Sequence, residues 1–481
     1  MHLAVIFRVT GTLLTFFSLT FLIPGFLGWY YQESTVNSFA LAFLITLSCG
    51  LLMWFLKPDK RELRSGDGFM ITALFYVGLG LFGAIPLYLE PTLNLSFSDA
   101  AFESMSGLTT TGATVITGLD QLPKSLLFYR QLLQWLGGMG IIVLAVAIFP
   151  MLGIGGMQLY RTESPGPAKD NKLTPRIAET ARGLWYIYLF LTVSCAAAYA
   201  VAGMDTFDAI SHSFSTVAIG GFSTHDASMG YFNSTAIETV AIIFMIVSGI
   251  NFGLHFLVWQ QKNPLRYFLD AEVRTYLLTL VAVAIVVCLL LSMHKPDGVN
   301  PISDGLFHTI SMATTTGFTT QDISTWPSAT PVLLLLAAFA GGCAGSTAGG
   351  IKMVRVLMVY KQGLREIKRL IHPKGVFPIK LNHRPVSDRM METIWGFFSV
   401  YVIVFFIMVI LIMVAGRLDF TTAFSAVGAC LNNLGPGLGA VSASYADLNE
   451  SVKWILMFAM MLGRLEIFTV LVLLTPAYWR R

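Results

Sequence analysis

Long apolar segments without charged residues constrain this chain of 481 residues more than any other feature. A helix needs roughly 20 mostly apolar residues to cross the hydrocarbon core of a bilayer. Nine segments of this kind contain no Asp, Glu, Lys or Arg, and a tenth contains only Arg464 and Glu466 as charged residues. They cover 9–32, 34–56, 68–89, 131–160, 183–204, 239–261, 275–294, 323–351, 393–416 and 454–479. The pattern predicts an all-α integral membrane protein with ten transmembrane helices.

Composition agrees with a lipid environment and excludes two other classes of protein. Charged residues make up 12% of the chain, against roughly 25% in an ordinary soluble domain. A soluble multi-domain protein would need more charges to cover its surface, and a disordered chain would not carry 55% hydrophobic residues. The first segment is too long for a signal-peptide core and is followed directly by a second one, so we read it as a membrane helix.

The distribution of charges predicts which side of the membrane each loop faces. With the N-terminus in the cytoplasm and alternating spans, most of the 31 Lys and Arg residues fall on the inner side, as the positive-inside rule requires. Both termini are then cytoplasmic. The outer segments carry 15 acidic and five basic residues. This excess would concentrate cations at the outer mouth, although ordinary loop composition is an alternative explanation.

Four outer segments share a repeated pattern built around a glycine. The four glycines lie 109, 96 and 118 residues apart, at Gly112, Gly221, Gly317 and Gly435. An aspartate stands 13 positions before the first three, at Asp99, Asp208 and Asp304, and Thr422 stands there in the fourth. Similarity at a fixed offset indicates a repeat architecture. Each unit reads as a span, a short segment, a glycine turn and a second span.

The short segment before each glycine has 12 or 13 residues, too few to cross a bilayer, and is therefore predicted to be a re-entrant pore helix. Asp or Thr at its start is a favourable N-cap. Irregular backbone within the membrane is tolerated where protein surrounds it or water fills a cavity. Four units around one axis satisfy this condition, and their carbonyl groups could line the axis as in potassium filters. For any single segment, an ordinary outer turn is the alternative.

Six short motifs occupy these turns and two of the apolar segments. They read TTTGAT at 109–114, AIGGFST at 218–224, TTTGFTT at 314–320, NNLGPG at 432–437, GGCAGSTAGGIK at 341–352 and GRLEIFT at 463–469. As a set they resemble the Trk/Ktr/HKT superfamily of cation transporters and, within it, the bacterial TrkH/TrkG group of potassium uptake subunits. The resemblance implies four span–pore–span repeats around one pore, preceded by two extra helices.

The chain divides accordingly into five parts. Residues 1–67 are the two extra N-terminal helices, and the repeats cover 68–160, 183–262, 275–365 and 391–481. The pore loops within these repeats are 98–114, 206–224, 302–320 and 419–437. Residues 341–350 are expected to form an intramembrane gate loop.

The resemblance implies that potassium ions bind to backbone carbonyl groups around the four glycines. The residues of this expected filter are Thr110, Thr111, Gly112, Ile219, Gly220, Gly221, Thr315, Thr316, Gly317, Asn433, Leu434 and Gly435. Glycine at position 112 favours potassium, because some plant relatives that favour sodium have serine there. Repeats two and four lack the threonines, so weaker selectivity than in a TVGYG channel is expected.

Five of the ten residues 341–350 are glycine, which costs a helix interior about 1 kcal/mol each relative to Ala. The helix is therefore predicted to break there, and the resemblance makes this segment the gate beneath the filter. The expected gate residues are Gly345, Ser346, Thr347, Gly349 and Arg464. A mid-membrane arginine costs at least roughly 2.5 kcal/mol on insertion scales and would repel cations. Helix packing through small residues and a structural ion pair are the alternatives; Glu466 is expected to face elsewhere.

Expectations about partners come from the resemblance. It implies a homodimer in the bacterial inner (plasma) membrane and a cytosolic TrkA-type subunit with nucleotide-binding (NAD or ATP) domains. That subunit would dock on the ten basic residues of 352–392, with anionic lipid as the alternative partner; the candidates are Arg355, Lys361, Arg365 and Lys368. No cofactor is expected on this chain, no nucleic acid partner, and no metal other than transported K+. His212, His255 and His308 are read as packing residues.

The sequence therefore favours potassium uptake through a gated filter. An ion-coupled secondary transporter, moving potassium in symport with protons or sodium, is the alternative. Secondary transporters usually have two inverted halves, whereas this chain shows four like-oriented units. The chain is not expected to be an enzyme, because the sequence carries no nucleophile–base or metal constellation at His-Glu spacing.

Overall fold

The computed structural model describes residues 3–55, 65–140, 177–327, 329–382 and 384–480. Helices dominate this part of the chain. The only described strands are β1 (Lys380–Leu381) and β2 (Arg384–Pro385), which pair antiparallel in a short hairpin. The predicted all-helical membrane architecture is confirmed at this level.

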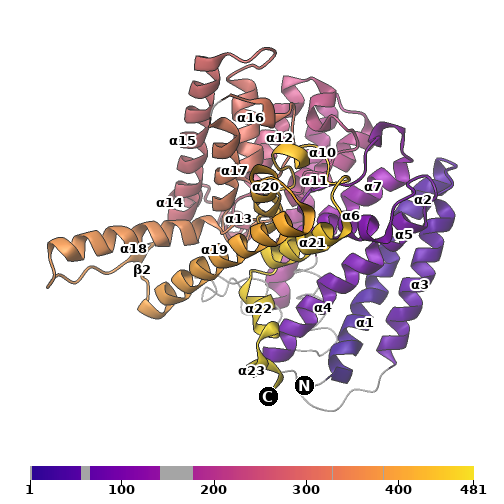
Figure 1. Cartoon of the computed structure of the whole chain (residues 1–481), viewed down its shortest axis with the longest axis horizontal. Coiled ribbons are helices and arrows are strands. Elements are labelled where there is room, and N and C mark those ends of the chain that lie inside the picture. The colour runs from indigo at the N-terminus through magenta and orange to yellow at the C-terminus, as the bar shows by residue number, and fades with distance from the viewer. Residues whose placement is uncertain (1–2, 56–64, 141–176, 328, 383, 481) are drawn as a thin grey trace.

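The N-terminal part consists of α1 (Leu3–Thr20), α2 (Leu22–Tyr30) and α3 (Val36–Trp54), which lie together at one side of the molecule in Figure 1. α1 and α3 approach closely where Gly11 faces Gly50. A Cβ atom on either glycine would come within 3.0 Å of the backbone of the opposite helix. Small residues at a crossing allow this contact between membrane helices.

The first two repeats follow these N-terminal helices. Repeat one contains α4 (Ser65–Gly83), α5 (Ile85–Leu89), α6 (Phe97–Leu108), η1 (Leu119–Gln121), α7 (Lys124–Trp135) and a π-helical turn, η2 (Leu136–Gly140). Repeat two contains α10 (Ile177–Val201), α11 (Thr206–Ala218), η4 (Ser228–Phe232), α12 (Thr235–Ser248) and α13 (Phe252–Gln261). Most of the predicted fourth span, 131–160, lies outside the described residues.

The last two repeats follow the same order. The short helix α14 (Leu265–Leu269) precedes repeat three, which contains α15 (Ala271–His294), α16 (Ser303–Ala313), η5 (Ile323–Thr325), α17 (Thr330–Ala340) and the first part of α18 (Met353–Ile371). Repeat four contains α19 (Asp388–Gly416), α20 (Phe420–Leu431), η6 (Gly439–Val441), α21 (Glu450–Arg464), α22 (Phe468–Leu474) and α23 (Pro476–Trp479). α18 extends away from the body of the molecule in Figure 1.

Several expected spans are interrupted. Six helices among the described residues are long and apolar enough to cross a membrane, or up to eight spans if each bent pair counts as one. α12 and α13 meet at 89°, where the side chain of Asn251 accepts a bond from the Gly253 N–H and starts a new helix. α21 and α22 meet at 118°, where Glu466 has a positive φ. The described residues thus support several membrane spans, and the count of ten stays a prediction.

The four short helices α6, α11, α16 and α20 coincide with the segments read as pore helices, but their caps differ from expectation. Ser96 and Asp205 cap α6 and α11, accepting bonds from the backbone N–H groups of Asp99 and Asp208 at 3.1 and 2.7 Å. Asp419 caps α20 in the same way. Asp99 and Asp208 thus stand three residues after the caps, and Asp304 is the second residue of α16, which has no side-chain cap at Ile302. In the first turn their charge still faces the positive end of the helix dipole.

Candidate functional site

The four turns after the short helices have the same backbone conformation. In each turn the glycine has a positive φ, and so does the residue two positions before it. These preceding residues are Thr110, Ile219, Thr315 and Asn433, with φ between 53° and 67°. A positive φ is uncommon for residues other than glycine. Its recurrence at one position in four sequences shows that the turns are built alike.

The four turns also close into a ring, which we call the glycine ring: residues 110–112, 219–221, 315–317 and 433–435. A Cβ atom added to each glycine would come well within 3.0 Å of a backbone carbonyl oxygen in the next repeat. The pairs are Gly112 with Gly220, Gly221 with Thr316, Gly317 with Leu434, and Gly435 with Thr111. The order runs from repeat one through four and back to one. All twelve residues expected in the filter therefore come together.

Threonine side chains in the ring bond within the protein. The hydroxyl of Thr111 lies 2.8 Å from that of Thr109, and Thr316 lies 2.8 Å from Thr314 in the same way. Thr109 and Thr314 in turn donate to carbonyl groups of their own helices. In repeats one and three, the same pair of threonine side chains therefore connects the ring to its short helix.

Repeats two and four, which lack these threonines, use residues that the sequence analysis missed. Gln134 on α7 donates to the Gly220 carbonyl oxygen and accepts from the Phe222 N–H at 3.1 Å. Tyr445 donates its hydroxyl to the Gly435 carbonyl oxygen at 2.8 Å. Gln134 could have been found from the sequence, because a glutamine within an apolar segment needs polar partners.

The predicted break at 341–350, the glycine loop, is present between α17 and α18, and the loop contacts three repeats. Thr347 donates to the carbonyl oxygen of Val217 at the end of α11. The Gly349 N–H donates to Thr315 Oγ1 at 2.7 Å, and the Gly350 N–H donates to the Asn432 carbonyl oxygen at 3.0 Å. The loop therefore lies against the ends of the short helices, at the base of the glycine ring.

Arg464 connects the glycine loop to repeat one. It is the last residue of α21, and its guanidinium donates to Thr110 Oγ1 at 3.2 Å and to the Thr347 carbonyl oxygen at 3.2 Å. It also donates to the carbonyl oxygens of Gly137 and Gly138. These four partners carry no formal charge. Glu466 pairs instead with Arg355, in agreement with the expectation that it faces away from Arg464.

Glu272, in the first turn of α15, is a third residue that the sequence analysis missed. Its Oε1 atom accepts bonds from the N–H groups of Ala344 at 2.6 Å and Val354 at 3.1 Å. Ala344 lies in the glycine loop, and Val354 lies in the first turn of α18. A single buried carboxylate therefore holds the loop and the helix after it against α15.

Of the four residues expected to dock the cytosolic subunit, Arg355 differs from the other three. Arg355 is buried, stacks on Phe397 and is paired with Glu466, so its proposed role in docking is not compatible with its position. Lys361 donates to the Lys380 carbonyl oxygen, and Arg365 contacts Asp388 at 3.2 Å. Lys368 lies in the last turn of the extended helix α18.

The buried histidines are hydrogen-bonded rather than merely packed. His212 Nε2 lies 2.9 Å from Ser223 Oγ, and His308 Nε2 accepts from the Thr320 N–H at 3.3 Å. His255 contacts Tyr267 and the Val247 carbonyl oxygen. Among the described residues, no group of three His, Cys, Asp or Glu side chains could hold a metal ion.

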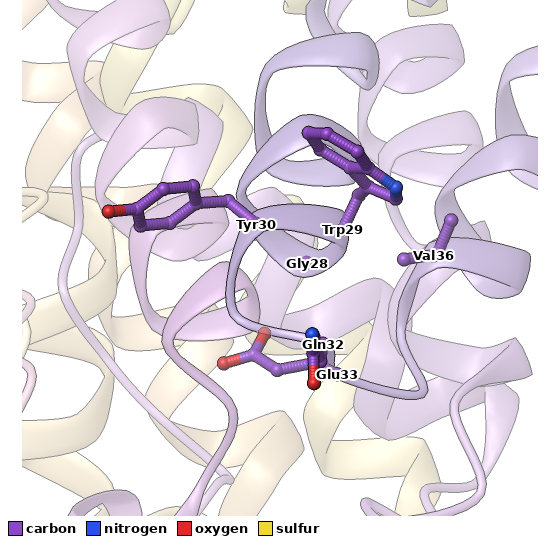
Figure 2. A pocket seen from close by; sticks show the side chains of 6 residues that line it. All are labelled: Gly28, Trp29, Tyr30, Gln32, Glu33 and Val36. Carbon is purple, nitrogen blue, oxygen red and sulfur yellow. The ribbon is translucent and has the colours of Figure 1, made fainter.

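A surface hollow where α2 ends and α3 begins is a separate feature (Figure 2). It is lined by Gly28, Trp29, Tyr30, Gln32, Glu33 and Val36. The Glu33 carboxylate accepts bonds from the N–H groups of Lys124 and Ser125, at the start of α7. The acid therefore acts as a cap for that helix.

Fold and ring together define a multi-pass integral membrane protein in which four short helices each lead into one turn of the ring. The model of the TrkH family, described as a cation transport protein, matches residues 35–481. The chain belongs to this family.

Similar proteins cover the full length of the chain. It is 54% identical to the Trk system potassium uptake protein TrkH of Halomonas elongata and 51% identical to that of Escherichia coli K12, with full coverage of both chains in each case. The crystal structure of the potassium transporter TrkH from Vibrio parahaemolyticus matches with a TM-score of 0.90 at 49% identity, over the whole of both chains.

Proposed function

We propose that this chain takes up potassium across the bacterial inner membrane through the glycine ring. The closure of four like turns into one ring is the observation that carries this proposal. Residues of alternating positive and negative φ turn successive carbonyl groups to one side of a strand, and rings of carbonyl oxygens replace the hydration shell of potassium in known filters. The relatives named above are potassium uptake proteins, which agrees with potassium as the transported ion.

The glycine loop and Arg464 form the gate in this proposal. The loop, with Gly345, Ser346, Thr347 and Gly349, contacts the ends of the short helices, and Arg464 bonds to both the ring and the loop, which supports placing its charge in the path of an ion that leaves the ring. A fixed positive charge in a poorly solvated passage repels cations. Uptake therefore requires the loop and Arg464 to move together.

Regulation by a cytosolic subunit extends the proposal. The relatives belong to a system named Trk, which agrees with further subunits. We assign docking of a TrkA-type nucleotide-binding subunit to the part of α18 beyond Arg355, where Lys361, Arg365 and Lys368 lie, and we propose a homodimer with both termini cytoplasmic. Arg355 connects this region to the gate, because it lies in the first turn of α18, close after the glycine loop, and pairs with Glu466, two residues after Arg464 in the chain.

Flux from proteoliposomes tests the proposal. A potassium gradient with no proton or sodium gradient should drive net potassium or rubidium movement through the wild-type protein. Movement that requires a proton or sodium gradient would establish the symport alternative, and no movement with or without the cytosolic subunit would refute potassium transport.

A matched pair of glycine variants tests the assignment of the ring. Gly112→Ser should lower potassium flux and selectivity, because its side chain would collide with the Gly220 carbonyl group. Gly118→Ser is the control, since Gly118 has a similar positive φ of 75° but no neighbouring atom within 4 Å. Equal effects of the two variants would indicate backbone strain in general and would contradict a specific role of the ring.

A further inference from the structure

Two opposite charges lie buried behind the glycine ring. Arg130 on α7 is 1% exposed and Glu103 on α6 is fully buried, and Arg130 Nε lies 2.7 Å from Glu103 Oε1. The desolvation of two charges can exceed the attraction between them, so a buried ion pair is weak evidence for a role in stability alone. Its position suggests instead that it orients the backbone around it.

The partners of Arg130 belong to two repeats. Nη2 donates to Thr114 Oγ1 at 3.1 Å in repeat one, and Nη1 donates to the Ser223 carbonyl oxygen at 3.0 Å in repeat two. The guanidinium also lies over the ring of Phe222, 4.3 Å from its centroid. The pair therefore connects the two chain segments that leave the glycine ring after Gly112 and Gly221. We call these segments, and their counterparts after Gly317 and Gly435, the outer strands, although their described residues pair in no β-sheet.

Glu103 completes this connection within repeat one. Its carboxylate accepts from the Thr114 hydroxyl at 3.0 Å and from the Val115 N–H at 2.9 Å. Charge-assisted hydrogen bonds of this kind are shorter and stronger than neutral ones, and the arginine fork fixes their direction. The outer strand of repeat one is thus held to its short helix and, through Arg130, to repeat two.

Comparison of the four repeats shows that this position has a common task. Nine residues before the ring glycine stand Glu103, His212, His308 and Ala426. His212 and His308 also bond the strand that follows their own glycine, and in repeat four the adjacent Ser425 does so through Leu438. Each repeat therefore anchors its outer strand to its short helix. Repeat one does so with an acid, Glu103, which is paired with an arginine.

We propose that the Glu103–Arg130 pair is a specificity-determining element of the ring. It fixes the spacing of repeats one and two and so the size of the cation that the ring carbonyl groups can surround. Both are positioning residues, because they contact the strands behind the ring and not the ion. The inference rests on the proposed potassium transport.

The test measures potassium and sodium permeation in proteoliposomes. Glu103→Gln leaves the arginine charge unpaired, Arg130→Lys keeps the charge but loses the fork, and Thr114→Val removes one hydroxyl at nearly constant shape. The loss of charge-assisted bonds should lower the potassium-to-sodium ratio about tenfold in the first two variants, and about threefold in the third. Thr114→Val is the variant least able to disturb folding.

Asp99→Asn is the matched control. It breaks another ion pair of the same short helix, between Asp99 and Lys453 at 2.6 Å, at the end away from the ring. Its potassium-to-sodium ratio should stay within about twofold of wild type, since Asp99 and Lys453 make no hydrogen bond with the described segments that follow Gly112 and Gly221 and lie at the other end of the short helix.

Two results would overturn the inference. One is a wild-type ratio in folded Thr114→Val and Arg130→Lys protein, and the other is an equal loss of selectivity in Asp99→Asn. A wild-type protein that conducts neither ion would instead refute the proposed function itself.

Discussion

The guanidinium of Arg464 donates to the carbonyl oxygen of Thr347 and, at the same distance of 3.2 Å, to the hydroxyl of Thr110. Thr347 belongs to the glycine loop and Thr110 to the glycine ring, so one side chain joins the two. Because Arg464 is the last residue of α21, before a bend of 118°, a change in that bend would move the charge and release the loop together.

Removal of the Arg464 charge should open the passage. We expect Arg464→Gln to raise potassium flux about tenfold in the absence of a cytosolic subunit, a coupling of the usual size between linked elements. Arg464→Lys, which keeps the charge but cannot reach all four partners, should show a smaller increase. Arg417→Gln, an exposed arginine at the end of α19, is the control. Unchanged flux in Arg464→Gln would contradict the proposed gate.

Loss of the Glu272 carboxylate should loosen the glycine loop. Glu272→Ala leaves the N–H groups of Ala344 and Val354 without their partner, which should cost about 2 kcal/mol of unfolding free energy. Thermal unfolding in detergent measures this loss, and basal potassium flux should rise in parallel. Glu366→Ala removes a half-exposed carboxylate on α18 and should change stability by less than about 1 kcal/mol. Similar behaviour of the two variants would show that Glu272 has no special role.

A methyl group on Gly349 should prevent the glycine loop from packing against Asn432 at the end of α20. An added Cβ would collide with the Asn432 carbonyl group, which is backbone at the base of the ring and cannot move aside. We therefore expect Gly349→Ala to leak potassium without the cytosolic subunit. Gly363→Ala is the control: this glycine lies within α18 with no atom within 4 Å, and alanine there should stabilise the helix by up to about 1 kcal/mol. A Gly349→Ala protein that passes no potassium without the cytosolic subunit would argue against the loop as the gate.

Acid should strengthen a contact between the loops that follow Gly112 and Gly221. His225 lies between Asp120 and Asp208, with Asp226 next to it in the chain, and stacks on Tyr231 and near His212. Burial opposes the charged ring, but the hydrogen bonds and charges of Asp208 and Asp120 outweigh it and raise the pKa of His225.

The sign of the pH dependence follows from this shift. The contribution of protonated His225 to stability is fully present below the ordinary histidine pKa, roughly 6.5, and is lost as the pH rises through the raised value in the folded protein. The difference in thermal midpoint between wild type and His225→Gln should therefore be larger at pH about 5.5 than at pH about 8.5. A difference that grows with pH would show that the neutral ring is the stabilising form.

Local pattern was sufficient to place the short helices and the four ring glycines. Their positions followed from segment length, glycine and the offset of 13 residues, all of which are properties of neighbouring residues in the chain. The break at 341–350 was likewise predictable, because five glycines in ten residues oppose a helix wherever they are placed. Membership in the family was visible for the same reason, since the motifs are short and contiguous.

Contacts between distant segments could not be read in this way. Gln134 and Gly220, or Glu272 and Ala344, lie 86 and 72 residues apart, and no sequence spacing brings them together. Ser96 and Asp205 cap α6 and α11 because each helix begins before the aligned aspartate, with its cap three residues earlier in the chain. The sequence pattern did not locate the start of a helix that finely.

The sequence by itself therefore determined a membrane protein of four like units, with the glycines and the helix break where they are. The tertiary structure alone decided that these units close into one ring, that Arg464 joins the ring to the glycine loop, and that Glu103 and Arg130 pair behind it. The physical reason is that hydropathy and backbone preference act within a few residues, whereas buried charges and carbonyl groups obtain partners only when separate helices pack around one axis.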